Sequence, residues 1–122
     1  MARILVIDDE DILRRMLRTV LEMEGHEVLE AADGKDALRL QRASPAELVI
    51  TDILMPEQDG IEVMLALRRE APQLKVIAMS GGGRFKQTEV LEMAEVLGAV
   101  ATLSKPFALD KMLEAVKQAL AA

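Results

Sequence analysis

Apolar residues follow two alternating patterns along this chain. Short apolar runs with few polar positions are typical of strands that are buried on both faces of a sheet. Between these runs, apolar residues recur every three or four positions, which predicts helices with one face on the core. The predicted strands are residues 4–7, 27–31, 47–51, 74–79 and 99–103, and the predicted helices are about 12–24, 34–44, 60–71, 88–97 and 109–120.

Each predicted strand is followed by a predicted helix, which is the pattern of parallel strands joined by right-handed crossovers. We therefore predict an α/β fold, a doubly wound five-stranded parallel sheet with helices on both faces. Glutamates at positions 27 and 30 indicate that the second strand lies at an edge of this sheet. A chain of 122 residues has the length of one domain, so residues 1–122 are expected to form a single unit.

Composition excludes several classes of function. A net charge of -6 without Trp or Tyr argues against direct nucleic-acid binding, which needs a basic surface and stacking aromatics. The absence of cysteine excludes disulfides and thiolate metal sites. No apolar run approaches the length of a membrane span, which is about 18 residues or more, so no membrane partner is expected. We expect a cytoplasmic protein.

Asp52 stands where the third apolar run ends. Pro56 disfavours helix at the preceding residue, so a loop is expected before the helix that Gly60 opens. Ligand and reaction sites in open α/β sheets gather at the carboxyl ends of strands, which gives Asp52 a functional interpretation. The alternative is an ordinary loop aspartate, because turns and caps often use this residue.

The predicted topology brings five polar residues to one edge of the sheet. Asp8 and Asp9 follow the first strand, Asp52 the third, Ser80 the fourth and Lys105 the fifth. Three neighbouring carboxylates repel one another unless a cation lies among them, and hard oxygen ligands favour Mg²⁺. Such a site suits phosphoryl transfer, with one carboxylate attacking phosphorus while Lys105 and Ser80 bind phosphoryl oxygens.

The complete set of motifs resembles the receiver domain of bacterial two-component response regulators, and the match runs in order along essentially the whole chain. The segments that carry the resemblance are Val6-Ile7-Asp8-Asp9-Glu10, Thr51-Asp52-Ile53-Leu54-Met55-Pro56 with Asp59-Gly60, Met79-Ser80-Gly81, Gly98-Ala99 and Lys105-Pro106-Phe107. The resemblance implies a flavodoxin-like sheet with strand order 2-1-3-4-5.

The resemblance also implies a mechanism. Asp52 would accept a phosphoryl group from a phosphohistidine of a sensor histidine kinase or phosphotransfer protein. Mg²⁺ would be held by Asp9, Asp52 and the backbone carbonyl of Leu54, with Asp8 assisting through metal-bound water. Ser80 and Lys105 would bind the phosphoryl group.

The implied output is a change in a partner-binding surface. Helix four, strand five and helix five would meet a downstream effector or output domain, and a homodimer through this surface is a further option.

Two features depart from the family pattern. Many members carry an inward-turning aromatic residue three positions before the lysine, where this chain has Thr102. The loop after Ser80 is also long and rich in glycine, and it places Phe85 at a site that we expect to be exposed.

Other polar residues have simpler interpretations. His26 is the only histidine, and we interpret it as a surface residue. The eight methionines are assigned to core packing. The arginines of the first and third helices are expected to lie on solvated faces; these are Arg14, Arg15, Arg18, Arg68 and Arg69.

Two alternatives to a phosphorylation switch remain open. An aspartyl phosphatase of the haloacid dehalogenase type needs a second aspartate two residues after the nucleophile, where this chain has Leu54. A receiver-like interaction module that ignores phosphate usually loses site residues, whereas this chain keeps all five.

Overall fold

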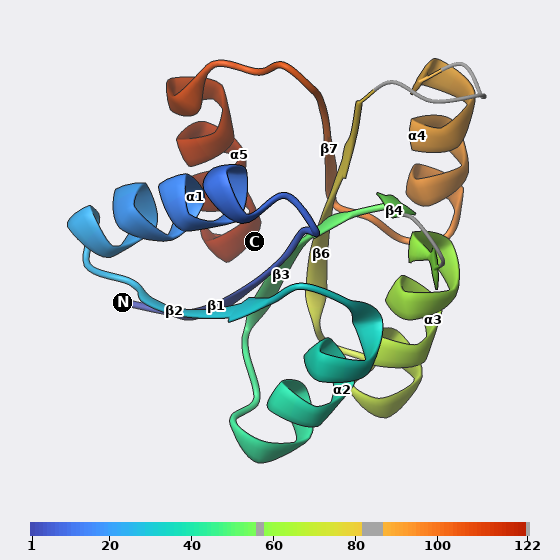
Figure 1. Cartoon of the computed structure of the whole chain (residues 1–122), viewed down its shortest axis with the longest axis horizontal. Helices are drawn as coiled ribbons and strands as arrows, with labels where there is room; N and C mark the ends of the chain where they lie inside the picture. Colours follow the sequence, from blue (N-terminus) through green and yellow to red (C-terminus); the bar gives the residue numbers. More distant parts are fainter. Residues whose placement is uncertain (56–57, 82–86, 122) are drawn as a thin grey trace.

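A parallel sheet of five strands runs through the middle of the molecule, with helices on both of its faces (Figure 1). The computed structural model describes residues 1–55, 58–81 and 87–121. The sheet has the order β2-β1-β3-β6-β7, which confirms the predicted order 2-1-3-4-5 and the flavodoxin-like fold. Its strands are β1 (Arg3–Ile7), β2 (Glu27–Ala31), β3 (Leu48–Asp52), β6 (Lys75–Ser80) and β7 (Ala101–Ser104).

Four helices connect these strands in sequence, and a fifth helix follows β7. Their bounds are α1 (Asp11–Met23), α2 (Gly34–Ala43), α3 (Gly60–Glu70), α4 (Gln87–Val96) and α5 (Leu109–Ala121). At the start of α2, Asp33 caps the helix, because its side chain accepts a hydrogen bond of 2.8 Å from the Asp36 backbone N–H. After α1, Gly25 adopts a φ of 92°, a left-handed conformation that glycine takes at low cost.

Alternation along β1 divides the core between the two faces of the sheet. Ile4 and Val6 pack in the cluster that includes α1 and α5, whereas Leu5 and Ile7 pack in the cluster that includes α2 and α3. A smaller cluster beneath α4 contains Ala94. Because neighbouring strand residues point to opposite faces, an apolar strand such as β1 supplies both clusters.

The structure differs from the predicted elements at two places. Residues 54–55 and 58–59 form a short antiparallel pair, β4 (Leu54–Met55) and β5 (Gln58–Asp59), where only a loop was expected. The last strand begins at Ala101 instead of residue 99. The chain leaves α4 through Gly98, whose φ is 110°, and the Ala99 N–H still bonds to the Ala94 carbonyl.

Several predicted surface residues have structural contacts instead. Arg14 is buried, and the half-buried Arg68 donates a hydrogen bond of 2.6 Å to the Gly98 carbonyl, so neither lies on a solvated face. Arg15 and Arg69 are exposed, as expected. His26 is half-buried, and its Nδ1 accepts a hydrogen bond of 3.2 Å from the Ala2 backbone N–H.

The methionine prediction was wrong in part. Core methionines are Met64, Met79 and Met112, whereas the exposed ones are Met1, Met16, Met23 and Met93. The predicted glycine-rich loop and Phe85 fall on residues 82–86, which lie outside the described residues. Within the described part of the chain, none of the helices combines the length and the apolar character needed to cross a membrane.

Candidate functional site

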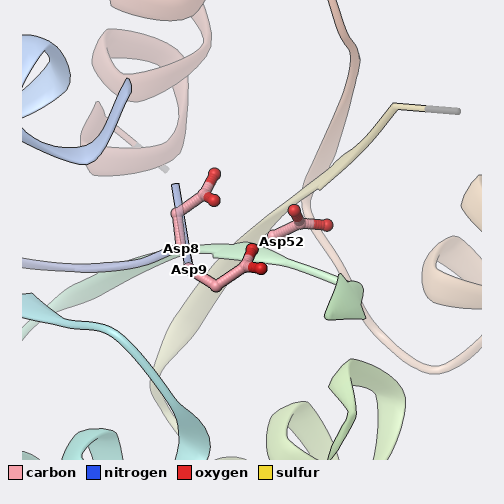
Figure 2. A group of neighbouring side chains, drawn as sticks. All are labelled: Asp8, Asp9 and Asp52. Atoms are coloured by element: carbon pink, nitrogen blue, oxygen red, sulfur yellow. The ribbon is translucent and has the colours of Figure 1, made fainter. Parts of the chain in front are cut away.

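The carboxyl ends of four neighbouring strands place the predicted site residues. Asp8 and Asp9 follow β1, Asp52 is the last residue of β3, Ser80 is the last residue of β6, and Lys105 follows β7. Figure 2 shows that the three aspartate side chains gather where β1 and β3 end. Each aspartate offers one carboxylate oxygen, and these three atoms all lie within 4.8 Å of one another. The three aspartates therefore lie together, as the sequence predicted.

Burial differs sharply within the cluster. Asp8 is fully buried and Asp52 is 4% exposed, whereas Asp9 is exposed. Desolvation raises the pKa of Asp9 above its ordinary value even in this outer position, and Coulombic repulsion from Asp8 acts in the same direction. Concentrated negative charge of this kind attracts a cation.

Lys105 lies directly between the two buried carboxylates. Its Nζ donates hydrogen bonds of 2.8 Å to Asp8 Oδ2 and 2.9 Å to Asp52 Oδ2. Burial opposes the charge on the ammonium, but these two hydrogen bonds outweigh it and raise the pKa of Lys105. Lys105 is therefore protonated at neutral pH. It offsets part of the repulsion between the carboxylates, which from the sequence we expected a metal ion alone to offset.

The backbone around Lys105 links it to Ser80. The Lys105 N–H donates a hydrogen bond of 2.7 Å to the Ser80 carbonyl, and the side chain of Ser80 is buried. The next residue, Gly81, lies against the lysine stem, since a Cβ added there would overlap Lys105 Cβ. The Lys105–Pro106 peptide is cis. The small residue at position 81 thus lets the lysine cross the edge of the sheet.

Gly60 has a corresponding role beside Asp52. A Cβ added to Gly60, the first residue of α3, would overlap the backbone of Ile53 and lie 2.7 Å from the Asp52 carbonyl oxygen. The Thr51 hydroxyl also donates a hydrogen bond of 3.0 Å to this carbonyl. The backbone of Asp52 is therefore packed tightly against the start of α3.

The turn after β1 holds Asp8 through several of its atoms. Its backbone N–H donates to the Ala31 carbonyl at 3.1 Å, and its Oδ1 accepts a hydrogen bond of 2.9 Å from the Glu10 N–H. Arg14 donates to the Asp8 carbonyl oxygen at 2.8 Å. From the sequence we expected Arg14 on a solvated face and so missed its role in this turn. The signal that could have indicated a buried partner was Glu30, an acidic residue in a strand whose other central positions are apolar.

The donor set fits a hard divalent cation. Three carboxylates with Lys105 leave an excess of negative charge, and carboxylate oxygens are the ligands that Mg²⁺ prefers. The group can hold a metal ion. The predicted backbone ligand, Leu54, lies in β4 two residues after Asp52, and its part in metal binding stays a prediction.

Thr102 takes the position of the aromatic residue that many receiver domains carry. It is half-buried in β7, and its hydroxyl lies 3.4 Å from Glu95 Oε1 of α4. The contact is long and exposed to water, so it contributes little to stability.

Comparisons with known proteins agree with this geometry. The family model for the response regulator receiver domain matches residues 4–117. The transcriptional regulatory protein PdtaR of Mycobacterium tuberculosis is 36% identical over 121 residues, and the match covers 97% of this chain. Sporulation initiation phosphotransferase F of Bacillus subtilis is 31% identical over 118 residues, which cover 97% of this chain and 93% of that protein.

The structural comparison gives the same result at the level of the fold. The crystal structure of the receiver domain of NtrX from Brucella abortus superposes with a TM-score of 0.90 at 31% identity, covering 98% of each chain. This chain spans only 56% of the length of PdtaR, so the likeness to that protein concerns one part of it. The chain belongs to the family of response regulator receiver domains, the signalling domains of two-component systems.

Proposed function

We propose that this protein is a signalling switch controlled by phosphorylation of Asp52. The observation that carries the proposal is the bridge made by Lys105, whose Nζ lies 2.8 Å from Asp8 Oδ2 and 2.9 Å from Asp52 Oδ2. A buried carboxylate beside a fixed cation, at the carboxyl edge of a parallel sheet, is an arrangement suited to accepting a phosphoryl group.

Asp52 acts as the nucleophile in this proposal. One of its carboxylate oxygens attacks phosphorus of a phosphohistidine on a sensor histidine kinase or phosphotransfer protein. The oxygen–phosphorus bond forms as the phosphorus–nitrogen bond to the imidazole breaks. The Lys105 ammonium moves from the carboxylate to a phosphoryl oxygen, and the Ser80 hydroxyl donates to another. Asp52 is the residue that ends the central strand β3 beside both Asp8 and Lys105.

In this proposal the Mg²⁺ site is formed by Asp8, Asp9, Asp52 and the Leu54 carbonyl. Bound there, Mg²⁺ would neutralise negative charge on the transferring phosphoryl group. The protein is not proposed to be a turnover enzyme, although its site would assist its own phosphorylation and dephosphorylation. We place this chemistry in the cytoplasm, without direct contact to nucleic acid or membrane.

The proposed output surface consists of α4, β7 and α5. Exposed apolar side chains support it, because Met93 and Val96 of α4 and Val100 before β7 are all more than half exposed. Such a surface suits an effector, an output domain or a second copy of the chain. Relatives such as PdtaR, which bear the name of transcriptional regulators and exceed this chain in length, support an output domain as the partner.

Acetyl phosphate with Mg²⁺ tests the proposal directly. We expect the wild-type protein to form a single acyl phosphate, detected by mass spectrometry, and Asp52→Asn to form none. Asp36→Asn is the matched control, because Asp36 is an exposed aspartate at the start of α2 and should leave labelling unchanged. Full labelling of Asp52→Asn would refute the assignment.

The same experiment separates the alternative functions. Release of phosphate over many turnovers would identify an aspartyl phosphatase. A wild-type protein that takes no label from acetyl phosphate or from any kinase preparation would identify a phosphate-independent interaction module. A stable acyl phosphate supports the switch.

A further inference from the structure

Arg14 is an arginine of α1 that turns inward instead of facing water. The residue is only 9% exposed, although its side chain carries a full charge. Its guanidinium reaches three partners, one through each nitrogen: Nη1 donates to the Asp8 carbonyl at 2.8 Å, Nε to Glu30 Oε1 at 3.0 Å, and Nη2 lies 2.8 Å from Asp11 Oδ1. Removing a charged guanidinium from water costs free energy, so its burial here indicates a specific role for the side chain.

The three partners come from different parts of the fold. Glu30 lies in β2, Asp11 begins α1, and Asp8 follows β1. A guanidinium is planar with donors in fixed directions, so two carboxylates that orient it also fix the direction of its third hydrogen bond. That third bond ends on the Asp8 carbonyl oxygen, which is part of the peptide group between Asp8 and Asp9.

The orientation of this peptide decides where Asp9 lies. A peptide group is planar, so holding its oxygen also fixes the bond that leads to the Asp9 Cα. Asp8 is held independently, since its side chain bonds Lys105 and the Glu10 N–H. Asp9 is exposed, so its position depends mainly on the backbone.

We propose that Arg14 is a positioning residue for cation binding: it fixes the Asp8–Asp9 peptide so that the Asp9 carboxylate stays beside Asp8 and Asp52. The inference rests on the proposed function, because it concerns the cation of that same site. Arg14 does not contact the phosphoryl group in this proposal. It acts through the backbone, as outer partners of metal ligands do.

An electrostatic role and a positioning role of Arg14 predict opposite changes in Mg²⁺ affinity when the residue is replaced. Arg14 is itself a cation next to an acidic cluster, so deleting its charge should by Coulomb's law strengthen the binding of Mg²⁺. Loss of the hydrogen bond to the Asp8 carbonyl should instead loosen the Asp9 carboxylate and weaken binding. The direction of the change therefore identifies the role.

The experiment measures the dissociation constant of Mg²⁺ by calorimetry, well below the melting temperature of each variant. Arg14→Gln is expected to raise this constant on the order of tenfold. Arg18→Gln is the matched control, because Arg18 also bonds Glu30 from α1, with Nη1 at 3.0 Å from Oε2, while the Asp8 carbonyl is bonded by Arg14. The control should bind Mg²⁺ as the wild type does or slightly more tightly.

A second variant keeps the test decisive if Arg14→Gln does not fold. Arg14→Lys retains the positive charge but not the planar fork, so it is expected to bind Mg²⁺ severalfold more weakly than the wild type. A residue that only stabilised the fold would lower the melting temperature without changing the dissociation constant of the folded protein. If every Arg14 variant that folds binds Mg²⁺ with wild-type affinity or more tightly, the inference is overturned.

Labelling by acetyl phosphate separates this inference from the proposed function. At saturating Mg²⁺, Arg14→Gln should still be labelled at Asp52, with half-saturation shifted to higher Mg²⁺ concentration. Absence of Mg²⁺ binding and of labelling in the wild type itself would reject the proposed function and with it the inference. Normal wild-type behaviour with unchanged Mg²⁺ affinity in the Arg14 variants would reject the inference alone.

Discussion

Lys105 shows how a single side chain alters the electrostatics of the site. The ammonium bridges Asp8 and Asp52 at hydrogen-bond distance, with Glu10 Oε1 at 3.5 Å. A buried carboxylate without such a partner would favour its neutral form and be a poor nucleophile. The bridge places a positive charge beside the buried Asp52 carboxylate, whereas Asp9 is exposed at the outer side of the cluster.

Gly60 is a position at which one added methyl group should disturb the backbone at the end of β3. Gly60→Ala places a methyl group against the backbone of Ile53 and the Asp52 carbonyl, which cannot move aside as a flexible side chain could. We expect the free energy of unfolding to fall by about 1–3 kcal/mol, measured by urea denaturation.

Glu62→Ala is the control for this substitution, because Glu62 is exposed in the first turn of the same helix. Its effect should stay within about 0.5 kcal/mol, as is usual for surface positions. Equal stability of Gly60→Ala and the wild type would contradict the close packing of α3 against the end of β3.

At the scale of elements, a small charge network ties α1 to β2. Glu30 accepts from Arg14 Nε and from Arg18 Nη1, each at 3.0 Å, with one carboxylate oxygen for each arginine. The side chain of Glu30 is 20% exposed, so water screens these contacts only in part. The network holds α1 against the edge strand β2.

The stabilising effect of this network should depend on pH in a defined direction. Burial favours the neutral form of Glu30, but hydrogen bonds from Arg18 and Arg14 outweigh it and lower the pKa of the carboxyl. A lowered pKa in the folded state means that the stabilisation is complete above the unfolded value of 4.5 and is lost as pH falls through the folded value.

Glu30→Gln is therefore expected to lower the free energy of unfolding at pH 7 by about 1–3 kcal/mol. The difference from the wild type should narrow as pH falls below 4.5, because Glu30 becomes protonated first in the unfolded chain and, at lower pH, in the folded protein. Urea denaturation of both proteins across this range measures the difference. Glu22→Gln removes only a more exposed pair with Arg18 and should cost less at pH 7. A difference that is constant with pH would contradict the assignment.

At the scale of the whole molecule, a cation that binds the folded state alone should stabilise the entire domain. The three carboxylates meet only when β1 and β3 are paired, so the unfolded chain has no equivalent site. At ten times its dissociation constant, Mg²⁺ should raise the melting temperature by roughly 3–6 °C. Asp9→Asn should reduce this rise, whereas Asp36→Asn should not. An unchanged melting curve in millimolar Mg²⁺ would count against the site.

The order of apolar runs and helical periods was enough to predict the architecture. A strand such as 48–51 has no polar side to expose, so it belongs in the centre of a sheet, and β3 lies there. Asp8, Asp52 and Lys105 could be assigned to one edge because the carboxyl ends of parallel strands coincide. This inference needs only the sequence of elements, without any knowledge of side-chain direction.

Contacts between distant side chains were decided by the tertiary structure. Lys105 and Asp8 are 97 positions apart, and their bond depends on the register of four strands and on the space that Gly81 leaves. A helical period likewise cannot tell an arginine that faces water from one that turns inward. Arg14 and Arg15 are neighbours in sequence, but only Arg14 meets Glu30 of β2, because strand pairing brings that carboxylate beneath α1. Apolar runs and helical periods thus predict which elements form and which strand ends meet, whereas side-chain packing fixes which charges pair, since pairing depends on side-chain geometry in three dimensions.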